Sequence, residues 1–153
     1  LHVRQCSHKS YIFRSLMCNS ILFFKAVAPY MIEKNYGRII SMSSVSAKRG
    51  GGVFGGAHYS AAKAGILAFS KAFAREVSPL GITVNSIAPG LAATDIRGGL
   101  EDEETQAKMT SDIPCRRMAK PEEIAAAVCF LASDEAAYIT GEEIDINGGS
   151  HMD

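Results

Sequence analysis

At 153 residues the chain is long enough for one domain with a buried core, and its sixteen basic and sixteen acidic side chains cancel. This balance indicates neither a basic surface for nucleic acid nor an acidic, solvating tail. The four cysteines are far apart and form no CxxC pair: Cys6, Cys18, Cys115 and Cys129. Their spacing argues against a zinc site and a disulfide framework, and it favours a protein of the reducing cytoplasm.

The chain is predicted to begin with an atypical segment over residues 1–18, which has no clear helical or strand periodicity. A mostly apolar helix is predicted over residues 19–35. Its apolar part, Ile21–Ile32, is interrupted by Lys25 and Pro29, and we expect it to be too short to span a bilayer. No contact with a membrane is therefore expected.

Downstream, short apolar runs alternate with helical patterns. RIISMSS at 38–44 and ITVNSIA at 82–88 are predicted as buried strands, separated by a loop at 46–58 and a long helix at 59–78. The remaining elements are predicted in this order: a polar, mobile flap with a short helix at 91–112, a helix from Pro121 to about Ser133, and a last strand at 142–149. This alternation predicts an α/β domain in which helices cover a parallel sheet.

A tyrosine and a lysine lie four residues apart at the start of the long helix, in the sequence YSAAK. Positions four apart share one helix face, so the ammonium of Lys63 is expected near the phenol of Tyr59. A nearby positive charge favours the phenolate, and such a phenol can exchange a proton with an alcohol or carbonyl oxygen. Ser43 and Ser44 end the preceding strand, where α/β proteins gather ligand sites. The alternative is a tyrosine packed at a helix start beside a solvated lysine.

Gly50, Gly52 and Gly55 give a literal G-x-G-x-x-G between a predicted strand and a predicted helix. The dinucleotide motif needs a tight turn directly after the strand and glycines that run into the helix. Here residues 44–49 intervene, and the acid about twenty residues on, Glu76, lies inside a helix. We therefore interpret the glycines as a surface loop or as a wall over a substrate pocket.

Ser60 and Lys63 also match S-x-x-K, the nucleophile motif of penicillin-binding proteins and serine β-lactamases. Those enzymes need a K-T-G as well, and the sequence has none. Ser60 would also project about 100° away from Tyr59 on a helix. Acyl transfer is therefore the less favoured alternative.

Four ordered stretches resemble the short-chain dehydrogenase/reductases: GRIISMSSVSA, YSAAKAG, GITVNSIAPG and KPEEIAAAVCFLASDEAAYITGEEIDINGG. The β-ketoacyl carrier-protein reductases and polyol dehydrogenases are the most similar branch, and the resemblance covers residues 21–149. It implies the carboxy-terminal portion of a Rossmann-like, doubly wound parallel sheet. It also implies hydride transfer between NAD(H) or NADP(H) and a carbonyl–alcohol pair, with the cofactor carrying the electrons.

The resemblance assigns a role to each candidate site residue. Tyr59 would be the general acid/base, Lys63 would favour its ionised form and bind the nicotinamide ribose, and Ser44 would orient the substrate oxygen. The nicotinamide end of the cofactor would be lined by Pro89, Gly90, Ala92 and Thr94. The segment 91–112 would be the substrate flap.

Two departures from the family pattern support an alternative, an inactive remnant that acts at most as a subunit or interaction partner. Full-length members begin with a strand and a glycine-rich turn for the dinucleotide, so the resemblance implies an amino-terminally truncated chain. The family also has an Asn in the helix before GRII, which falls here on Leu16. Asn19 could replace it only if the helix start is shifted.

The long helix is predicted to turn one face to the sheet, formed by Ile66, Phe69, Phe73 and Val77. Its other side carries small or apolar residues where a monomer would expose polar ones: Ala61, Ala64, Leu67 and Ala68. The family pairs this helix and the preceding one across a dimer axis, so a homodimer or homotetramer is expected of an intact protein. The alternative is cover by the preceding helix of the same chain.

Overall fold

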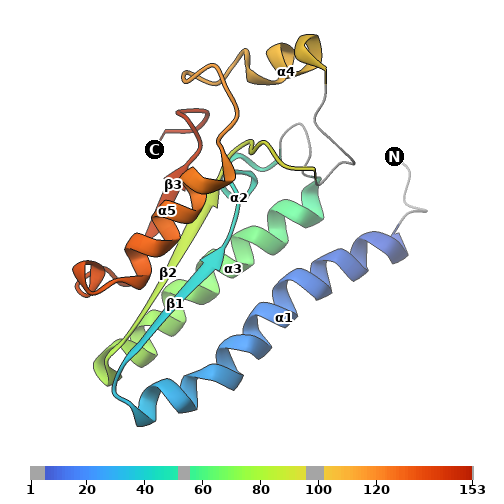
Figure 1. Ribbon diagram of the computed structural model, residues 1–153. Helices are drawn as coiled ribbons and strands as arrows, with labels where there is room; N and C mark the ends of the chain where they lie inside the picture. The colour runs from blue at the N-terminus through green and yellow to red at the C-terminus, as the bar shows by residue number, and fades with distance from the viewer. Residues whose placement is uncertain (1–5, 52–55, 96–101, 153) are drawn as a thin grey trace.

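The computed structural model describes residues 6–51, 56–95 and 102–152, and its centre is a parallel sheet of three strands (Figure 1). The strands are β1 (Gly37–Met42), β2 (Ile82–Pro89) and β3 (Glu143–Ile146), in the spatial order β1-β2-β3. Gly37 pairs with Ile82 and Ser86 with Glu143, so the strands advance in the same direction. The predicted α/β class and Rossmann-like parallel sheet are confirmed.

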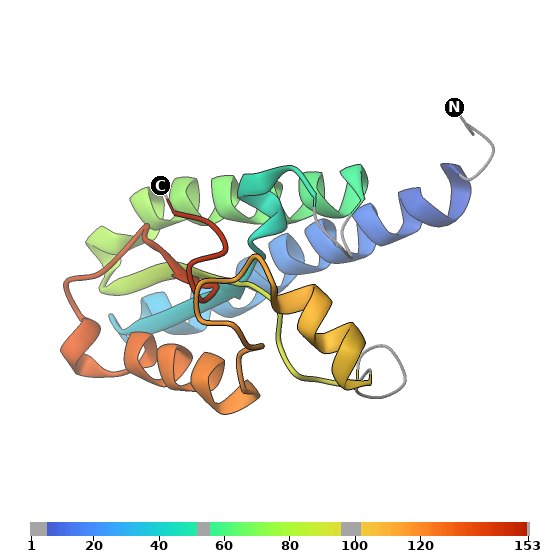
Figure 2. The same ribbon diagram turned by 90° about the horizontal axis from the view of Figure 1, so that it is seen from above.

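Helices cover both faces of this sheet. The helices are α1 (Cys6–Glu33), α2 (Ser46–Arg49), α3 (Ala57–Val77), α4 (Glu103–Thr110) and α5 (Pro121–Ala132), with short 3-10 turns at η2 (Ser78–Leu80) and η3 (Asp134–Ala136). Seen from above, α1 and α3 lie on one side of the strands and α5 on the other (Figure 2). The predicted boundaries of α3, β2 and α5 agree with these within about two residues.

Two apolar clusters hold the layers together, one on each face of the sheet. Side chains of β2 alternate between the faces, so Ile82 and Val84 join the cluster under α1 and α3, whereas Ile87 joins the cluster under α5. All three are at most 1% exposed. Because β2 is buried on both faces, as is typical of a central parallel strand, its polar residues Thr83, Asn85 and Ser86 are buried along with its apolar ones.

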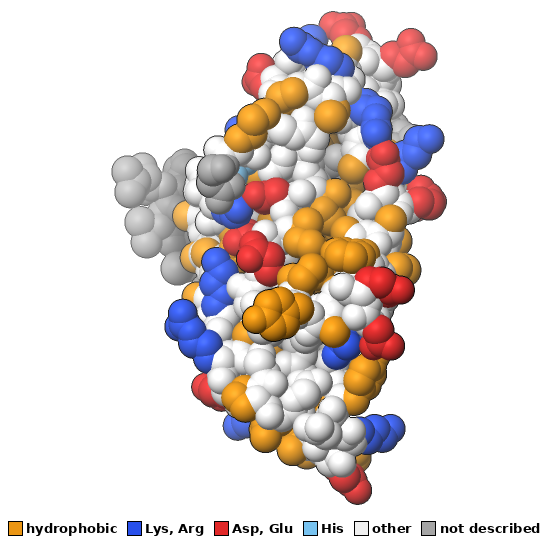
Figure 3. Space-filling view, turned by 90° about the vertical axis from the view of Figure 1, so that its left-hand side faces the viewer, with side chains coloured by type: hydrophobic (Ala, Val, Ile, Leu, Met, Phe, Trp, Pro, Cys, Tyr) orange, Lys and Arg blue, Asp and Glu red, His pale blue; other side chains and the backbone are white. Residues whose placement is uncertain are grey.

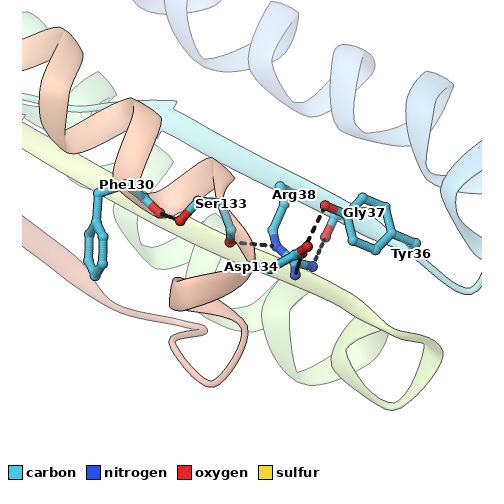
Figure 4. A network of polar contacts seen from close by, with 6 residues as sticks. All are labelled: Tyr36, Gly37, Arg38, Phe130, Ser133 and Asp134. Carbon is cyan, nitrogen blue, oxygen red and sulfur yellow. Dashed lines mark hydrogen bonds and ion pairs between the residues drawn. The ribbon is translucent and has the colours of Figure 1, made fainter.

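A polar network closes the end of the sheet that lies away from the candidate site (Figure 4). Arg38 of β1 donates to Asp134 at 3.2 Å and to the Ser133 carbonyl at 3.4 Å, and its guanidinium lies 4.6 Å from the Tyr36 ring centroid. Tyr36 also donates to Asp134 at 3.2 Å. The network joins the start of β1 to the end of α5.

The prediction of an atypical segment over residues 1–18 is wrong from Cys6 onward, because α1 begins there and continues through Pro29 to Glu33. Its part from Arg14 to Glu33 is long and apolar enough, by length and composition, to cross a membrane. The prediction from Ile21–Ile32 that this apolar helix is too short to span a bilayer was therefore wrong about its length. Phe24 is nevertheless only 4% exposed and packs against α3. The helix period was missed because both of its faces carry apolar residues.

The predicted faces of α3 are partly correct. Ile66 and Val77 are buried, as predicted. Phe69 and Phe73 are only partly buried and pack on Phe24 of α1, with ring centroids 5.4 and 5.7 Å away. The preceding helix therefore covers part of α3.

Leu67 is 9% exposed, so its place on an outward face was wrong. Ala61 and Ala68 do remain exposed. The outward face of α3 therefore has fewer apolar residues than predicted, and it also exposes Lys71, Arg75 and Glu76.

The predicted loop at 46–58 contains the short helix α2, which ends at Gly50 in a left-handed conformation (φ 74°). Gly52 and Gly55 of the G-x-G-x-x-G pattern lie outside the described residues. Within the predicted flap 91–112, α4 is the expected short helix, with Asp102 accepting the Thr105 amide as its cap.

Candidate active site

The carboxyl ends of β1 and β2 stay together beyond the strands. The Ser43 amide donates to the Ile87 carbonyl at 2.8 Å, and the Val45 amide donates to the Pro89 carbonyl at 3.0 Å. The serine pair after β1 and the loop after β2 therefore lie at the same end of the sheet, the carboxyl end of its strands, as parallel strands require.

Helix α3 brings Tyr59 and Lys63 into contact at the carboxyl end of β1. The Lys63 ammonium lies 5.8 Å from the centroid of the Tyr59 ring, which is within the range of a cation–π contact. Lys63 is 8% exposed, and burial lowers the pKa of its ammonium because the charged form is less well solvated. The predicted one-turn pair is therefore formed.

The Lys63 ammonium donates to the Met42 carbonyl at 2.8 Å. Successive residues of a strand direct their backbone groups to alternate sides, and Ser43 directs its amide to β2. The Met42 carbonyl therefore points to the opposite edge of β1, where no described strand pairs with it. Lys63 thus satisfies a carbonyl on the open edge of the sheet.

The two serines after β1 have different surroundings. The Ser43 hydroxyl is 2% exposed and donates to the Lys63 carbonyl at 3.1 Å, which fixes α3 to the strand end. The Ser44 hydroxyl is half-buried and accepts the Ser46 amide at 3.2 Å, at the start of α2. The described polar contacts join Ser44 to neither Tyr59 nor Lys63, so Ser44 stays a prediction as the substrate-orienting residue.

A buried cluster of hydroxyls lies beneath the pair, and the sequence reasoning missed it. Ser41 of β1 lies 2.7 Å from the Ser86 hydroxyl of β2 and 3.0 Å from the Ser70 hydroxyl of α3. All three side chains are at most 6% exposed. The alternation of Ser41 and Ser43 in an apolar strand was the signal that could have revealed this polar seam. It joins α3 to two strands two turns beyond Lys63.

The loop after β2 carries the residues predicted to line the nicotinamide. The Gly90 amide donates to the Ile146 carbonyl of β3 at 3.0 Å. A side chain at Gly90 would meet Asn147 Cα at 2.9 Å, so the close approach of these two loops requires glycine. Pro89, Gly90, Ala92 and Thr94 are each half-buried, so each keeps surface that a ligand could reach.

A pocket of about 290 Å³ adjoins this loop. It is lined by Leu91, Cys115, Arg117, Ala119, Glu123, Asp145, Ile146, Asn147 and Gly148. Asp145 also pairs with Lys48 of α2 at 2.6 Å, which links the segment after Ser44 to β3. The sequence reasoning gave no role to Arg117, Glu123 or Asp145, whose partners lie far away in the sequence or on another element.

Other predicted groups are placed unfavourably for chemistry. The Ser60 hydroxyl is buried without a hydrogen-bond partner, which argues against a nucleophile. Asn19 is exposed and donates to Ser15 of its own helix at 3.5 Å. Within the described ranges, no three His, Cys, Asp or Glu side chains are grouped to hold a metal ion.

Known proteins are similar to this chain in sequence and in fold. Residues 14–151 match the family model described as enoyl-(acyl carrier protein) reductase. The chain is 51% identical over 128 residues to the 3-oxoacyl-[acyl-carrier-protein] reductase FabG of Escherichia coli K12, which covers 84% of this chain and 51% of the relative. It is 48% identical over 122 residues to an acetoacetyl-CoA reductase of Allochromatium vinosum, covering 80% of this chain and 48% of the relative.

The fold is also similar to a solved structure, that of the TT0495 protein from Thermus thermophilus, with a TM-score of 0.82 and 34% identity. The similarity covers 90% of this chain and 60% of that one. The chain spans about half the length of the two reductases named above. The family match, the relatives and the fold together show that the chain belongs to the short-chain dehydrogenase/reductase family.

Proposed function

We propose that the chain is the catalytic and carboxy-terminal portion of an oxidoreductase that transfers a hydride between NAD(H) or NADP(H) and a carbonyl–alcohol pair. The observation that carries the proposal is the contact between the Lys63 ammonium and the Tyr59 ring at the carboxyl end of β1. The printed names of two relatives, a 3-oxoacyl carrier-protein reductase and an acetoacetyl-CoA reductase, support a 3-oxoacyl thioester as the substrate class.

In this proposal Tyr59 is the proton donor to the carbonyl oxygen during reduction and the acceptor during oxidation. Lys63 stabilises the phenolate by its charge, and its own position is fixed by the Met42 carbonyl at 2.8 Å. Ser44 holds the substrate oxygen from the strand end. The nicotinamide, when bound, supplies or accepts the hydride.

The described residues fit one end of a dinucleotide better than the other. Lys63 and the half-buried loop of Pro89, Gly90, Ala92 and Thr94 suit the ribose and nicotinamide. Ser43, Ser44 and Val45 join β1 to α2, and this described connection has no glycine turn for a pyrophosphate. This half-fit supports a second candidate, a remnant without cofactor binding.

The test is a titration of the purified chain with NADH and NADPH, followed by nicotinamide fluorescence, and then an assay of NADPH oxidation with acetoacetyl-CoA. We expect Tyr59→Phe to keep the fluorescence response and to lose about 100-fold or more of the turnover. Tyr138→Phe is the matched control, because Tyr138 is fully exposed. No response to either cofactor would support the remnant instead.

We also propose that α1 mediates self-association. Its outward face exposes Leu22 and Phe23 at 62% each and Tyr30 at 70%. A band of apolar side chains on the face around α5 and β3 offers a second surface (Figure 3), and Phe130 of α5 is 45% exposed. Light scattering should give the mass of a dimer for the wild type and a lower mass for Phe23→Glu. Leu80→Glu should have the same mass as the wild type. Equal masses for all three would contradict this role of α1.

A further inference from the structure

The segment between α4 and α5 returns to the loop that follows β2. The Ala119 amide donates to the Leu91 carbonyl at 2.9 Å, and the Ala93 amide donates to the Ala119 carbonyl at 2.9 Å. These bonds form a parallel bridge between Ala92 and Ala119. Residues 91–93 are therefore held against Ala119, which lies two residues before the start of α5.

A bidentate ion pair fixes the neighbours of that residue. The two terminal nitrogens of Arg117 donate to the two carboxylate oxygens of Glu123 at 2.7 and 2.6 Å. Arg117 also donates to the Met118 carbonyl at 3.1 Å, and Glu123 accepts the Lys120 amide at 2.8 Å. Because the fork of the guanidinium matches both carboxylate oxygens, the pair fixes orientation as well as distance. One carboxylate thus holds both the segment before α5 and the start of α5.

The pair is placed to act locally rather than on global stability. Its side chains are 53% and 42% exposed, and exposed ion pairs contribute little to the free energy of unfolding. Both residues line the pocket of about 290 Å³, as do Leu91 and Ala119. The hydrogen bond from Arg117 lowers the pKa of Glu123 to about 2, so the carboxylate stays charged near neutral pH.

We propose that Arg117 and Glu123 are positioning residues that hold the loop 91–94 in place through Ala119. The consequence for the cofactor, that they keep Ala92 and Thr94 where the nicotinamide end binds, rests on the function proposed above. The positioning itself does not depend on that function.

Hydrogen exchange of the complete chain, measured residue by residue by NMR, tests the positioning. In Glu123→Gln the side-chain carbonyl oxygen of the glutamine can still accept the Lys120 backbone amide, but the bidentate ion pair with Arg117 is lost. We expect the amides of Ala93 and Ala119 to exchange at least about tenfold faster, and those of Val45 and Gly90, bonded to Pro89 and Ile146, to keep their rates. Glu122→Gln, a change of the same kind on the adjacent residue, should leave all four rates unchanged.

Unchanged protection of Ala93 and Ala119 in Glu123→Gln would overturn the proposal. So would an equal acceleration of all four amides, because that would show a global loss of stability. Arg117→Gln is the second variant and should reproduce the pattern from the other side of the pair.

A cofactor arm separates this inference from the proposed function. If the wild type responds to NADPH, Glu123→Gln should raise the dissociation constant several-fold while Glu122→Gln leaves it unchanged; an unaltered constant would overturn the cofactor consequence. If the wild type does not respond, the proposed function fails, and the exchange rates alone still decide the positioning.

Discussion

Tyr59 and Lys63 stand on a helix whose inner side is buried, whereas the loop 89–94 is held from outside by exposed contacts. Under α3 lie apolar side chains and the Ser41 hydroxyl cluster, with exposures of a few per cent. The loop is fixed by backbone hydrogen bonds and by an ion pair about half exposed to solvent. Removing a contact under α3 should therefore lose more free energy of unfolding than removing a contact of the loop.

This difference matches what the two regions would do in the proposed reaction. A proton donor must keep its distance to the reacting oxygen, so it belongs on a packed helix. A loop that admits and releases a ligand needs contacts that can open at small cost. The following predictions test the comparison, from the largest expected effect to the smallest.

The largest loss of stability is expected from Ile87→Ala, at the buried end of β2. Ile87 is 0% exposed and packs against Leu131, so its truncation leaves a cavity. We expect a loss of about 2–5 kcal/mol in the free energy of unfolding, measured by urea denaturation. Leu80→Ala, at a position 39% exposed, should cost much less. Similar losses for both would contradict the tight packing of Ile87 against Leu131.

A smaller loss is expected from Ser41→Ala. Removing this hydroxyl leaves those of Ser70 and Ser86 buried without their partner. The expected cost is about 1–3 kcal/mol in the free energy of unfolding. Ser111→Ala is the control, because the Ser111 hydroxyl is exposed and bonds only within its own turn. A neutral Ser41→Ala would show that the cluster does not anchor α3.

The pH dependence of stability should reveal the buried ammonium of Lys63. Its pKa in the folded chain is lowered from 10.5, so the folded chain releases this proton before the unfolded chain does. The unfolded state then binds more protons, so the free energy of unfolding should rise with pH up to about 10.5. The unfolding free energy of the wild type minus that of Lys63→Met should therefore become more positive in that window. Lys71→Met, at an exposed position, should show no such trend.

The smallest effect is expected from Glu123→Gln, measured as the change in thermal midpoint. The pKa of Glu123 is lowered from 4.5 to about 2, so its stabilising contribution is complete above pH 4.5. That contribution is lost as the pH falls through about 2, because the folded chain then takes up the proton as well. The difference between wild type and variant should therefore shrink between pH 4.5 and 2. A difference that stays constant with pH would place its cause outside the ion pair.

Much of the fold could be predicted from local patterns. The buried strands at 82–88 and 38–44 are short apolar runs, and the helix from Pro121 has a start signal at its first position. The contact of Tyr59 with Lys63 followed from the helix period alone, because residues four apart share a face. The start of α1 and the short helix α2 did not, since neither has a clear periodic signal.

What the sequence by itself determined is the three strands, the helices α3 and α5, their order, and the Tyr59–Lys63 pair, which is close in the chain. Tertiary structure alone decided that Ser43 bonds to α3 while Ser44 turns to α2, that Lys63 meets the Met42 carbonyl, and that Arg117 reaches Glu123 beside the loop after β2. The physical reason is range. Helix and strand periods act between residues a few positions apart, whereas these contacts depend on how whole elements pack and on which backbone groups the sheet leaves unpaired.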